Sequence, residues 1–357
     1  MQKNIKERVA LSALTLVSFV AVASAVVGTL TLNRDECTNS SLNPNLLGDG
    51  LISANNTFIA DSGGSPVYEC GTGDVANRQI ISNHARVTFE HIMFAAPDLW
   101  GMDVASNGNG NKMAASSDKK SSLSFWGTSN LTQITEETGE HFDTDIYQFT
   151  GGFDKAVGNL FFGSALSYAH TEDEQRTVTS TSETVGFTPY AAYKIHDNIF
   201  ASALAGYLYT HTNRINGGSD LDTHDYITEG NINAFKVIDS FILKGRLGVR
   251  YKHTITSPEI GVAGRDNSFD ELTWVGDGEV GYVLSNKLRI YTGLLYEYYD
   301  REASGASSRV RDSIAFMRYG AEYPVSNDLT LGAKIQHDVN EEDRDYITGS
   351  INARLVF

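Results

Sequence analysis

Residues 347–357 read ITGSINARLVF, and apolar and polar side chains alternate along the stretch. Successive side chains of a β-strand point to opposite faces, so the pattern predicts a strand with one apolar and one polar face. An open edge on such a strand would pair with other chains, whereas a closed membrane barrel pairs both edges and turns the apolar face to lipid. We therefore expect the closing strand of a transmembrane barrel. Its apolar or small face holds Ile347, Gly349, Ile351, Ala353, Leu355 and Phe357.

The same alternation recurs from residue 121 onward. It is clearest at residues 241–252, where apolar residues alternate with Lys244, Arg246, Arg250 and Lys252. Each cation would cost roughly 2–4 kcal/mol at the midplane of a bilayer, so this face must point inward. The predicted fold class is all-β, a 12-stranded antiparallel transmembrane β-barrel. We expect its strands at about residues 121–132, 143–155, 158–171, 183–195, 198–211, 223–236, 239–253, 268–283, 286–301, 311–324, 327–340 and 344–357.

Short and long connections alternate between these segments. The short ones, such as 239–240 and 285–286, consist of Asp, Ser and Asn, which suit tight hairpin turns. The longer ones, such as 212–222 and 254–267, are polar. Outer-membrane barrels have this asymmetry, with short periplasmic turns and long outer loops.

Pro189 is the exception to the pattern, because it lies inside the expected strand 183–195. Proline has no backbone N–H to donate, and a closed barrel has no free edge to accommodate it. We expect a bulge or an interrupted ladder at this position.

Residues 1–25 have the features of a secretory signal peptide. Basic residues come first, an apolar core follows at 9–22, and Ala23-Ser24-Ala25 fits a cleavage site. Beyond this segment no apolar run approaches the roughly 20 residues of a transmembrane helix. The expected location is the outer membrane of a Gram-negative bacterium, reached through the periplasm.

Residues 26–120 differ from the strand region in composition. The segment 26–74 is rich in Asn, Ser and Gly and holds Cys37 and Cys70, for which export favours a disulfide. Residues 75–93 have apolar side chains at helical spacing and would form a helix of about 28 Å, close to the roughly 25 Å apolar band of a barrel. This helix either threads the lumen or packs in a small outer or periplasmic domain. The rest of 75–120 then serves as a linker.

Residues 121–357 resemble the autotransporter β-domain family, the outer-membrane barrels of type V secretion. The resemblance rests on short stretches whose order and spacing match the family's pattern. These are Phe125-Trp126-Gly127, Asp145-Ile146-Tyr147, Gly151-Gly152-Phe153-Asp154, Gly158-Asn159-Leu160, Gly163, Ser167-Tyr168, Tyr190-Ala191-Ala192-Tyr193-Lys194 and the terminal Phe357.

The resemblance implies a translocator barrel, threaded by a helix, that delivers the preceding segment (the passenger) to the cell surface. It also implies that the barrel-assembly machinery recognises the last strand through Ile351, Ala353, Leu355 and Phe357. Family passengers are usually far longer than residues 26–74, so the passenger is vestigial or the barrel itself is the functional part. The expected partners are this machinery, outer-membrane lipid and an unknown surface ligand. A net charge of −16 argues against nucleic acid.

No catalytic, cofactor or metal site is predicted. Gly48-Asp49-Gly50 lacks the serine of the esterase passengers that some family members carry, and no other nucleophile or phosphate-binding motif occurs. His170, His211 and His253 lie near strand ends without a ligand pattern. We therefore expect a protein that is not an enzyme.

The inward-facing charges are the candidate functional residues. They either pair with one another across the wall, or form a basic surface that binds the helix or a translocating chain and favours anions in an open pore. The predicted function is a translocator and anchor; the alternative is a passenger-less barrel that acts as a pore or as an adhesin through its acidic loops. The residues expected to line the lumen are Lys244, Arg246, Arg250, Lys252, Arg289, Glu297, Arg318, Glu322, Lys334 and Arg354.

Overall fold

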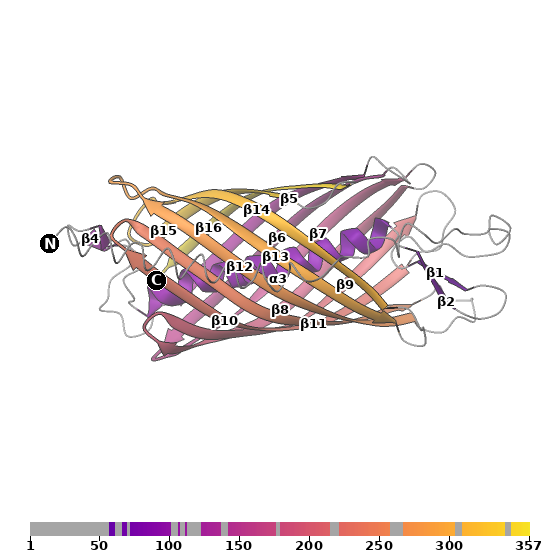
Figure 1. Ribbon diagram of the computed structural model, residues 1–357, viewed down its shortest axis with the longest axis horizontal. Helices are drawn as coiled ribbons and strands as arrows, with labels where there is room; N and C mark the ends of the chain where they lie inside the picture. The colour runs from indigo at the N-terminus through magenta and orange to yellow at the C-terminus, as the bar shows by residue number, and fades with distance from the viewer. Residues whose placement is uncertain are drawn as a thin grey trace.

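Twelve antiparallel strands, β5 to β16, form a closed barrel in which each strand pairs with its neighbours in the sequence and β16 pairs with β5 (Figure 1). The predicted fold class is therefore confirmed. The computed structural model describes residues 57–60, 66–69, 72–100, 106–107, 111–112, 123–136, 142–175, 179–214, 221–257, 267–303, 309–339 and 344–357. The expected signal peptide at residues 1–25, Cys37 and Cys70 lie outside these residues.

All twelve strands overlap the segments expected from the alternation, but several are longer. β7 extends to Gln175 and β8 begins at Thr179, where 171 and 183 were expected. The added residues are mostly Thr, Ser, Glu and Asp on both faces, so they continue the hydrogen-bonded ladder without an apolar alternation to mark it. The strands are β5 (Leu123–Glu136), β6 (Phe142–Val157), β7 (Leu160–Gln175), β8 (Thr179–His196), β9 (Ile199–Arg214), β10 (Leu221–Ile238), β11 (Phe241–Ser257), β12 (Asn267–Val283), β13 (Arg289–Ala303), β14 (Arg309–Pro324), β15 (Leu329–Asp338) and β16 (Arg344–Val356).

The two ends of the barrel differ in the length of their connections. At one end, the short-turn end, strands are joined by two to five residues, as at 158–159, 239–240 and 284–288. Gly158 and Asp239 have φ of 58° and 55° there, a left-handed conformation that Gly and Asp tolerate in hairpin turns. At the other, the long-loop end, β11 and β12 are separated by residues 258–266.

The wall separates an apolar exterior from a polar interior. Ile351 and Leu166 are 69% and 64% exposed on the outside, whereas Thr348 and Arg354 of β16 are buried inside. A contiguous apolar surface around the whole barrel requires lipid rather than water. Within the described residues, no helix is long and apolar enough to cross a membrane.

The barrel closes through contacts at both faces of the β16–β5 pair. Inside, the hydroxyls of Thr132 and Thr348 lie 2.9 Å apart. At the short-turn end, the N–H of Phe357 donates to the carbonyl of Leu123 (2.9 Å), and the Phe357 ring packs edge-on against Phe125. The terminal aromatic residue therefore joins the last strand to the first.

At Pro189 the ladder is interrupted. The pairing of β8 with β9 omits Thr188 and Pro189 and resumes in the same register on either side. Of the two accommodations expected, the interrupted ladder is the one found, and the bulge lies further along β8, between Lys194 and His196.

Helix α3 (Thr72–Leu99) runs inside the barrel along its long axis (Figure 1). It is longer than the expected 75–93, and its 28 residues span about 42 Å. His84 and Phe89 are both 0% exposed, although they lie on different faces of the helix. Such burial on all sides shows that the helix threads the lumen, and the alternative of a packing helix in a separate small domain is wrong.

The helix begins at the long-loop end and ends at the short-turn end. Asn77 donates to Asp225, near the start of β10, and Arg354, near the end of β16, donates to Asp98. The hairpin of β1 (Thr57–Ala60) and β2 (Pro66–Glu69) therefore lies at the long-loop end, as Figure 1 shows. After the helix, the short strands β3 (Ser106–Asn107) and β4 (Asn111–Lys112) precede β5, which starts at the short-turn end.

A charge placed on the apolar wall tests the orientation of β16. Ile351→Arg should destabilise the barrel by roughly 2–4 kcal/mol, because it puts a guanidinium in the middle of the lipid-facing band. Asp345→Arg is the matched control, since Asp345 is on the same exposed face but near the strand's long-loop end. It should cost no more than about 1 kcal/mol. Urea unfolding in lipid vesicles measures both, and equal effects would contradict the orientation.

Candidate functional site

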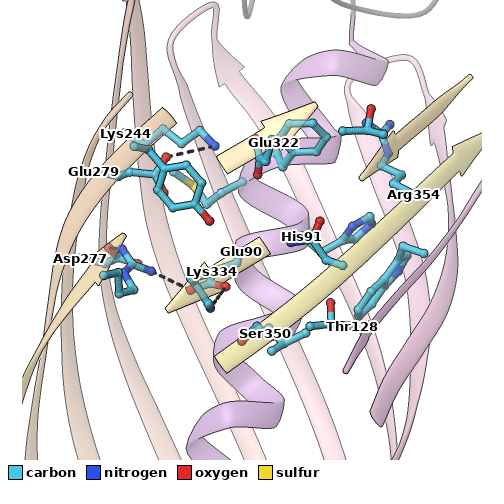
Figure 2. A pocket seen from close by; sticks show the side chains of 18 of the residues that line it. Glu90, His91, Thr128, Lys244, Asp277, Glu279, Glu322, Lys334, Ser350 and Arg354 are labelled. Atoms are coloured by element: carbon cyan, nitrogen blue, oxygen red, sulfur yellow. Dashed lines mark hydrogen bonds and ion pairs between the residues drawn. The ribbon is translucent and has the colours of Figure 1, made fainter. Parts of the chain in front are cut away.

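The charged side chains of α3 meet the charged side chains of the wall in the middle of the lumen. Glu90 accepts hydrogen bonds from Arg318 Nη1 (2.7 Å) and from Lys334 Nζ (2.6 Å). Figure 2 shows the second of these contacts beside the helix. Arg318 and Lys334 come from β14 and β15 and are buried. One helix carboxylate therefore pairs with a cation from each of two neighbouring strands.

A second contact joins the helix to an arginine of β11 and a glutamate of β13. The carboxylate of Glu297 lies 3.4 Å from Arg86 Nη2 and 3.2 Å from Arg250 Nη2. Arg250 also donates to Ser82 Oγ on the helix (2.9 Å) and to Glu229 (2.7 Å). All three charged groups at the centre are at most 1% exposed, so they rely on one another in place of water.

Further ion pairs hold both ends of the helix. At the long-loop end, Arg78 lies 3.6 Å from Glu271 and 3.5 Å from Asp312. At the short-turn end, Arg354 donates to Asp98 at 2.8 Å. Helix and wall are therefore paired along the whole length of α3.

An aromatic cluster fixes the helix against β5 and β6. The His91 ring stacks on Trp126, with centroids 4.3 Å apart, and His91 Nε2 donates to Asp154 Oδ2 (2.5 Å). Ser124 Oγ donates to the other oxygen of Asp154 (2.5 Å), and Trp126 Nε1 donates to Tyr190 Oη (2.8 Å). This cluster uses residues from three of the stretches that resemble the autotransporter pattern: Trp126, Asp154 and Tyr190.

Two glycines of the same pattern make room for these rings. A Cβ on Gly163 would lie 2.3 Å from the carbonyl oxygen of Phe153 and 2.7 Å from Tyr190. A Cβ on Gly152 would lie 2.4 Å from the carbonyl of Ser164 and 2.9 Å from Trp126 Nε1. Larger residues at either position would displace the wall or the aromatic side chains.

The wall also carries ion pairs of its own. Arg289 contacts both Glu279 and Glu322, and Lys244 lies 3.5 Å from Glu279. Arg246 lies 3.6 Å from Glu229 and 3.5 Å from Asp277, and Lys252 lies 3.4 Å from Glu271. Pairing across the wall and contact with the helix therefore occur together, although the sequence left them as alternatives.

All ten residues expected to line the lumen have inward-facing side chains. Nine are at most 8% exposed, and the side chain of Glu322 is 12% exposed. Those that contact the helix through the bonds above are Arg250, Glu297, Arg318, Lys334 and Arg354. Those paired within the wall are Lys244, Arg246, Lys252, Arg289 and Glu322.

Several other residues of the site were not expected. The helix carries Glu90, Arg86, His91 and Asp98, but only the spacing of its apolar residues was used to predict it. The wall acids were detectable, because they occupy the inward positions of their strands. They are Asp154, Asp225, Glu229, Glu271, Asp277 and Glu279.

A cavity of about 80 Å³ remains beside the helix, between α3 and the wall near β11 and β16 (Figure 2). Its lining includes Glu90, Lys244, Arg246, Lys334 and Arg354. A space of this size holds a few water molecules, not a polypeptide. In the part of the chain that the structure describes, no group of three His, Cys, Asp or Glu residues is placed to hold a metal ion.

The described arrangement has counterparts among solved structures. The translocator domain of the autotransporter NalP from Neisseria meningitidis matches with a TM-score of 0.56 at 13% identity, and the match covers 78% of this chain and 99% of that one. The fold is that of an autotransporter translocator barrel. At this identity the likeness concerns the fold alone.

Two further autotransporter structures match at lower scores. The β-domain of BrkA from Bordetella has a TM-score of 0.49 at 9% identity, covering 65% of this chain and 98% of that one. The transport unit of AIDA-I from Escherichia coli has a TM-score of 0.48 at 11% identity, covering 76% and 98%. No protein-family model and no curated protein sequence matches the chain.

Removing the shared carboxylate tests how strongly the helix is held. Glu90→Gln should weaken the docking of α3 by roughly 3–5 kcal/mol, because Arg318 and Lys334 remain buried without their common partner. The rate at which an added protease cleaves the helix in the folded barrel measures this loss. Glu174→Gln, the same change at an exposed position of β7, should leave the rate unchanged. Equal rates for the two variants would contradict a holding role for Glu90.

Proposed function

We propose that the protein is an outer-membrane translocator and anchor that displays the segment ahead of α3 on the cell surface. The observation that carries the proposal is the direction of the helix, which enters the lumen at the long-loop end and leaves it at the short-turn end. In an outer-membrane barrel the long loops face the outside and the short turns face the periplasm. A chain in this direction has its N-terminal segment outside and its connection to β5 in the periplasm.

The ion pairs between helix and wall support the anchoring part of the proposal. A displayed segment stays attached only if the helix does not slide out of the lumen. The pair of Glu90 with Arg318 and the buried pair of Arg86 with Glu297 oppose sliding, because any shift along the axis separates several charges at once. The residues need no chemistry beyond this pairing, and we propose no enzymatic activity.

The same proposal includes two partners besides lipid. The barrel-assembly machinery is the first, through the outward-facing Ile351, Leu355 and Phe357 and the neighbouring Ala353 of the closing strand. A surface ligand for residues 26–74 is the second. The support for the machinery is the exposed aromatic end of β16, which the resemblance to the autotransporter family singles out.

An epitope tag tests display directly. A tag inserted immediately before residue 72 should be labelled by antibody on intact cells, because the chain there lies at the long-loop end. The same tag in the two-residue turn at 239–240 is the control and should be labelled only after the outer membrane is permeabilised. Labelling of both tags, or of neither, on intact cells would contradict the proposed direction.

A second candidate function, an anion-favouring pore, is supported by what the helix neutralises. Without α3, the wall loses Glu90 and Asp98, and Arg318, Lys334 and Arg354 lose their helix partners. Arg78 and Arg86 leave with the helix as well, so what changes is less the number of charges than the exposure of these three wall cations to the pore. Cations that face a pore favour anions.

Conductance in planar bilayers distinguishes the two functions. Deletion of residues 72–99 should produce large anion-preferring steps, while the intact chain conducts little if its helix serves as an anchor. In the deletion background, Lys244→Glu with Arg246→Glu should reduce the anion preference, whereas Lys236→Glu on the outer face should not. Large, steady conductance of the intact chain would favour the pore over the anchor.

A further inference from the structure

Three neighbouring hairpins repeat one arrangement on the outer wall at the long-loop end. In each, the first strand carries Tyr-x-His and the second strand carries a carboxylate directly opposite the histidine. The three sets, on β7–β8, β9–β10 and β11–β12, are Tyr168, His170 and Glu183; Tyr209, His211 and Asp222; and Tyr251, His253 and Asp270. Successive tyrosines are separated in the sequence by about the length of one hairpin. The strand register therefore places the three sets at equivalent positions of their hairpins.

Two of the sets have the same hydrogen-bond geometry. Asp222 Oδ1 accepts from Tyr209 Oη at 2.6 Å and from His211 Nδ1 at 2.8 Å. Asp270 Oδ1 accepts from Tyr251 Oη at 2.6 Å and from His253 Nδ1 at 2.8 Å. Each carboxylate thus uses one oxygen to order a phenol and an imidazole, and its side chain stays about half exposed, at 45% and 54%.

Further rings connect these two sets into one surface. His224 of β10 bonds to Tyr207 Oη through Nδ1 (2.7 Å), and its ring centroid lies 5.3 Å from that of Tyr209. Tyr226 lies 5.3 Å from Tyr207 and 6.4 Å from His253. The two sets with these rings form a continuous surface over β9, β10, β11 and β12, here called the histidine–tyrosine band.

The histidine–tyrosine band lies where the apolar wall ends. On β10 and β11, the exposed Tyr226 and Tyr251 are followed toward the long loops by the outward His224 and His253. On β9, Tyr207 is followed by Tyr209 and then by His211. Aromatic residues of barrels bound the apolar band at the level of the lipid headgroups. The imidazoles and carboxylates therefore lie among the headgroups of the outer leaflet.

The chemistry of the band favours sugar over phosphate. No lysine or arginine occupies an outward position within residues 207–213, 222–228 or 249–255. Carboxylates repel phosphate, but they accept hydrogen bonds from hydroxyls, and imidazole donates or accepts. Phenol rings add an apolar face for the C–H groups of a sugar.

We propose that the histidine–tyrosine band binds the sugar hydroxyls of the glycolipids in the outer leaflet. The band would hold the barrel to its surrounding lipid at one sector of the wall, β9 to β12. The inference needs the outer-membrane location but not the helix or a displayed segment, so it stands or falls separately from the translocator proposal.

Thermal unfolding of the full mature chain in two kinds of vesicle tests the band. One vesicle contains phosphatidylethanolamine and phosphatidylglycerol, and the other also contains a short-chain lipopolysaccharide. The glycolipid should raise the unfolding temperature of the unmodified chain. Asp222→Ala with Asp270→Ala should abolish that rise and lower the amount of glycolipid retained on purification by about tenfold.

Two controls make the outcome decisive. Asp143→Ala with Asp145→Ala removes the same charge from β6 at the same rim and should keep the rise. The rise should also survive a chelator, since hydroxyls need no bridging cation. A rise that is absent from the unmodified chain, lost in both double variants, or lost with the chelator would overturn the proposal. If the double variant fails to fold, Asp270→Ala alone should lose part of the rise.

Discussion

Closure of the ladder between β16 and β5 is the constraint from which the rest of the molecule follows. Inside a bilayer, backbone N–H and C=O groups have no water to bond, so every strand must be paired on both edges. Twelve strands meet this condition only as a ring, and the ring divides the side chains into two populations. Alternate residues face lipid and are apolar, and the residues between them face a narrow interior.

The interior has its own requirement, because charges that leave water need partners. Some wall cations in the lumen pair with carboxylates of the helix. Glu90 pairs with Arg318 and Lys334, and Asp98 pairs with Arg354. In return, Arg86 and Arg78 of the helix find wall carboxylates. Removing one partner of a buried ion pair destabilises a protein more than forming the pair stabilises it. The pairs therefore fix the position of the helix in the lumen more than they raise the free energy of unfolding.

Much of this architecture was predictable because strand alternation is expressed directly in residue types. Four cations on one face of β11 were enough to assign inside and outside. The extensions of β7 and β8 were not predictable, since polar residues on both faces carry no period. The expected helix ended at residue 93, where the apolar spacing stops, whereas α3 continues to Leu99 through Pro97, which lacks the N–H that would donate to the carbonyl of Met93.

The helix partners escaped prediction for a different reason. A helix enclosed on all sides has no solvent face, so polar residues such as His84 and Arg86 interrupt the apolar period without marking a surface. The wall residue that each of these side chains contacts depends on the rotation of the helix and on its position along the barrel axis. No local sequence pattern encodes either of them. Asp154, which His91 and Ser124 share, is likewise recognisable only when α3, β5 and β6 are brought together.

The contact between Thr132 and Thr348 joins residues 216 positions apart. Pairings of such separation carry the greatest chain-entropy cost and form late in folding, whereas each hairpin along the ring closes locally. Since α3 precedes β5 in the chain and occupies the centre, it enters either while the sheet is still open or, once the seam has formed, along the barrel axis. Closure of the seam therefore restricts every later movement of the helix to one direction.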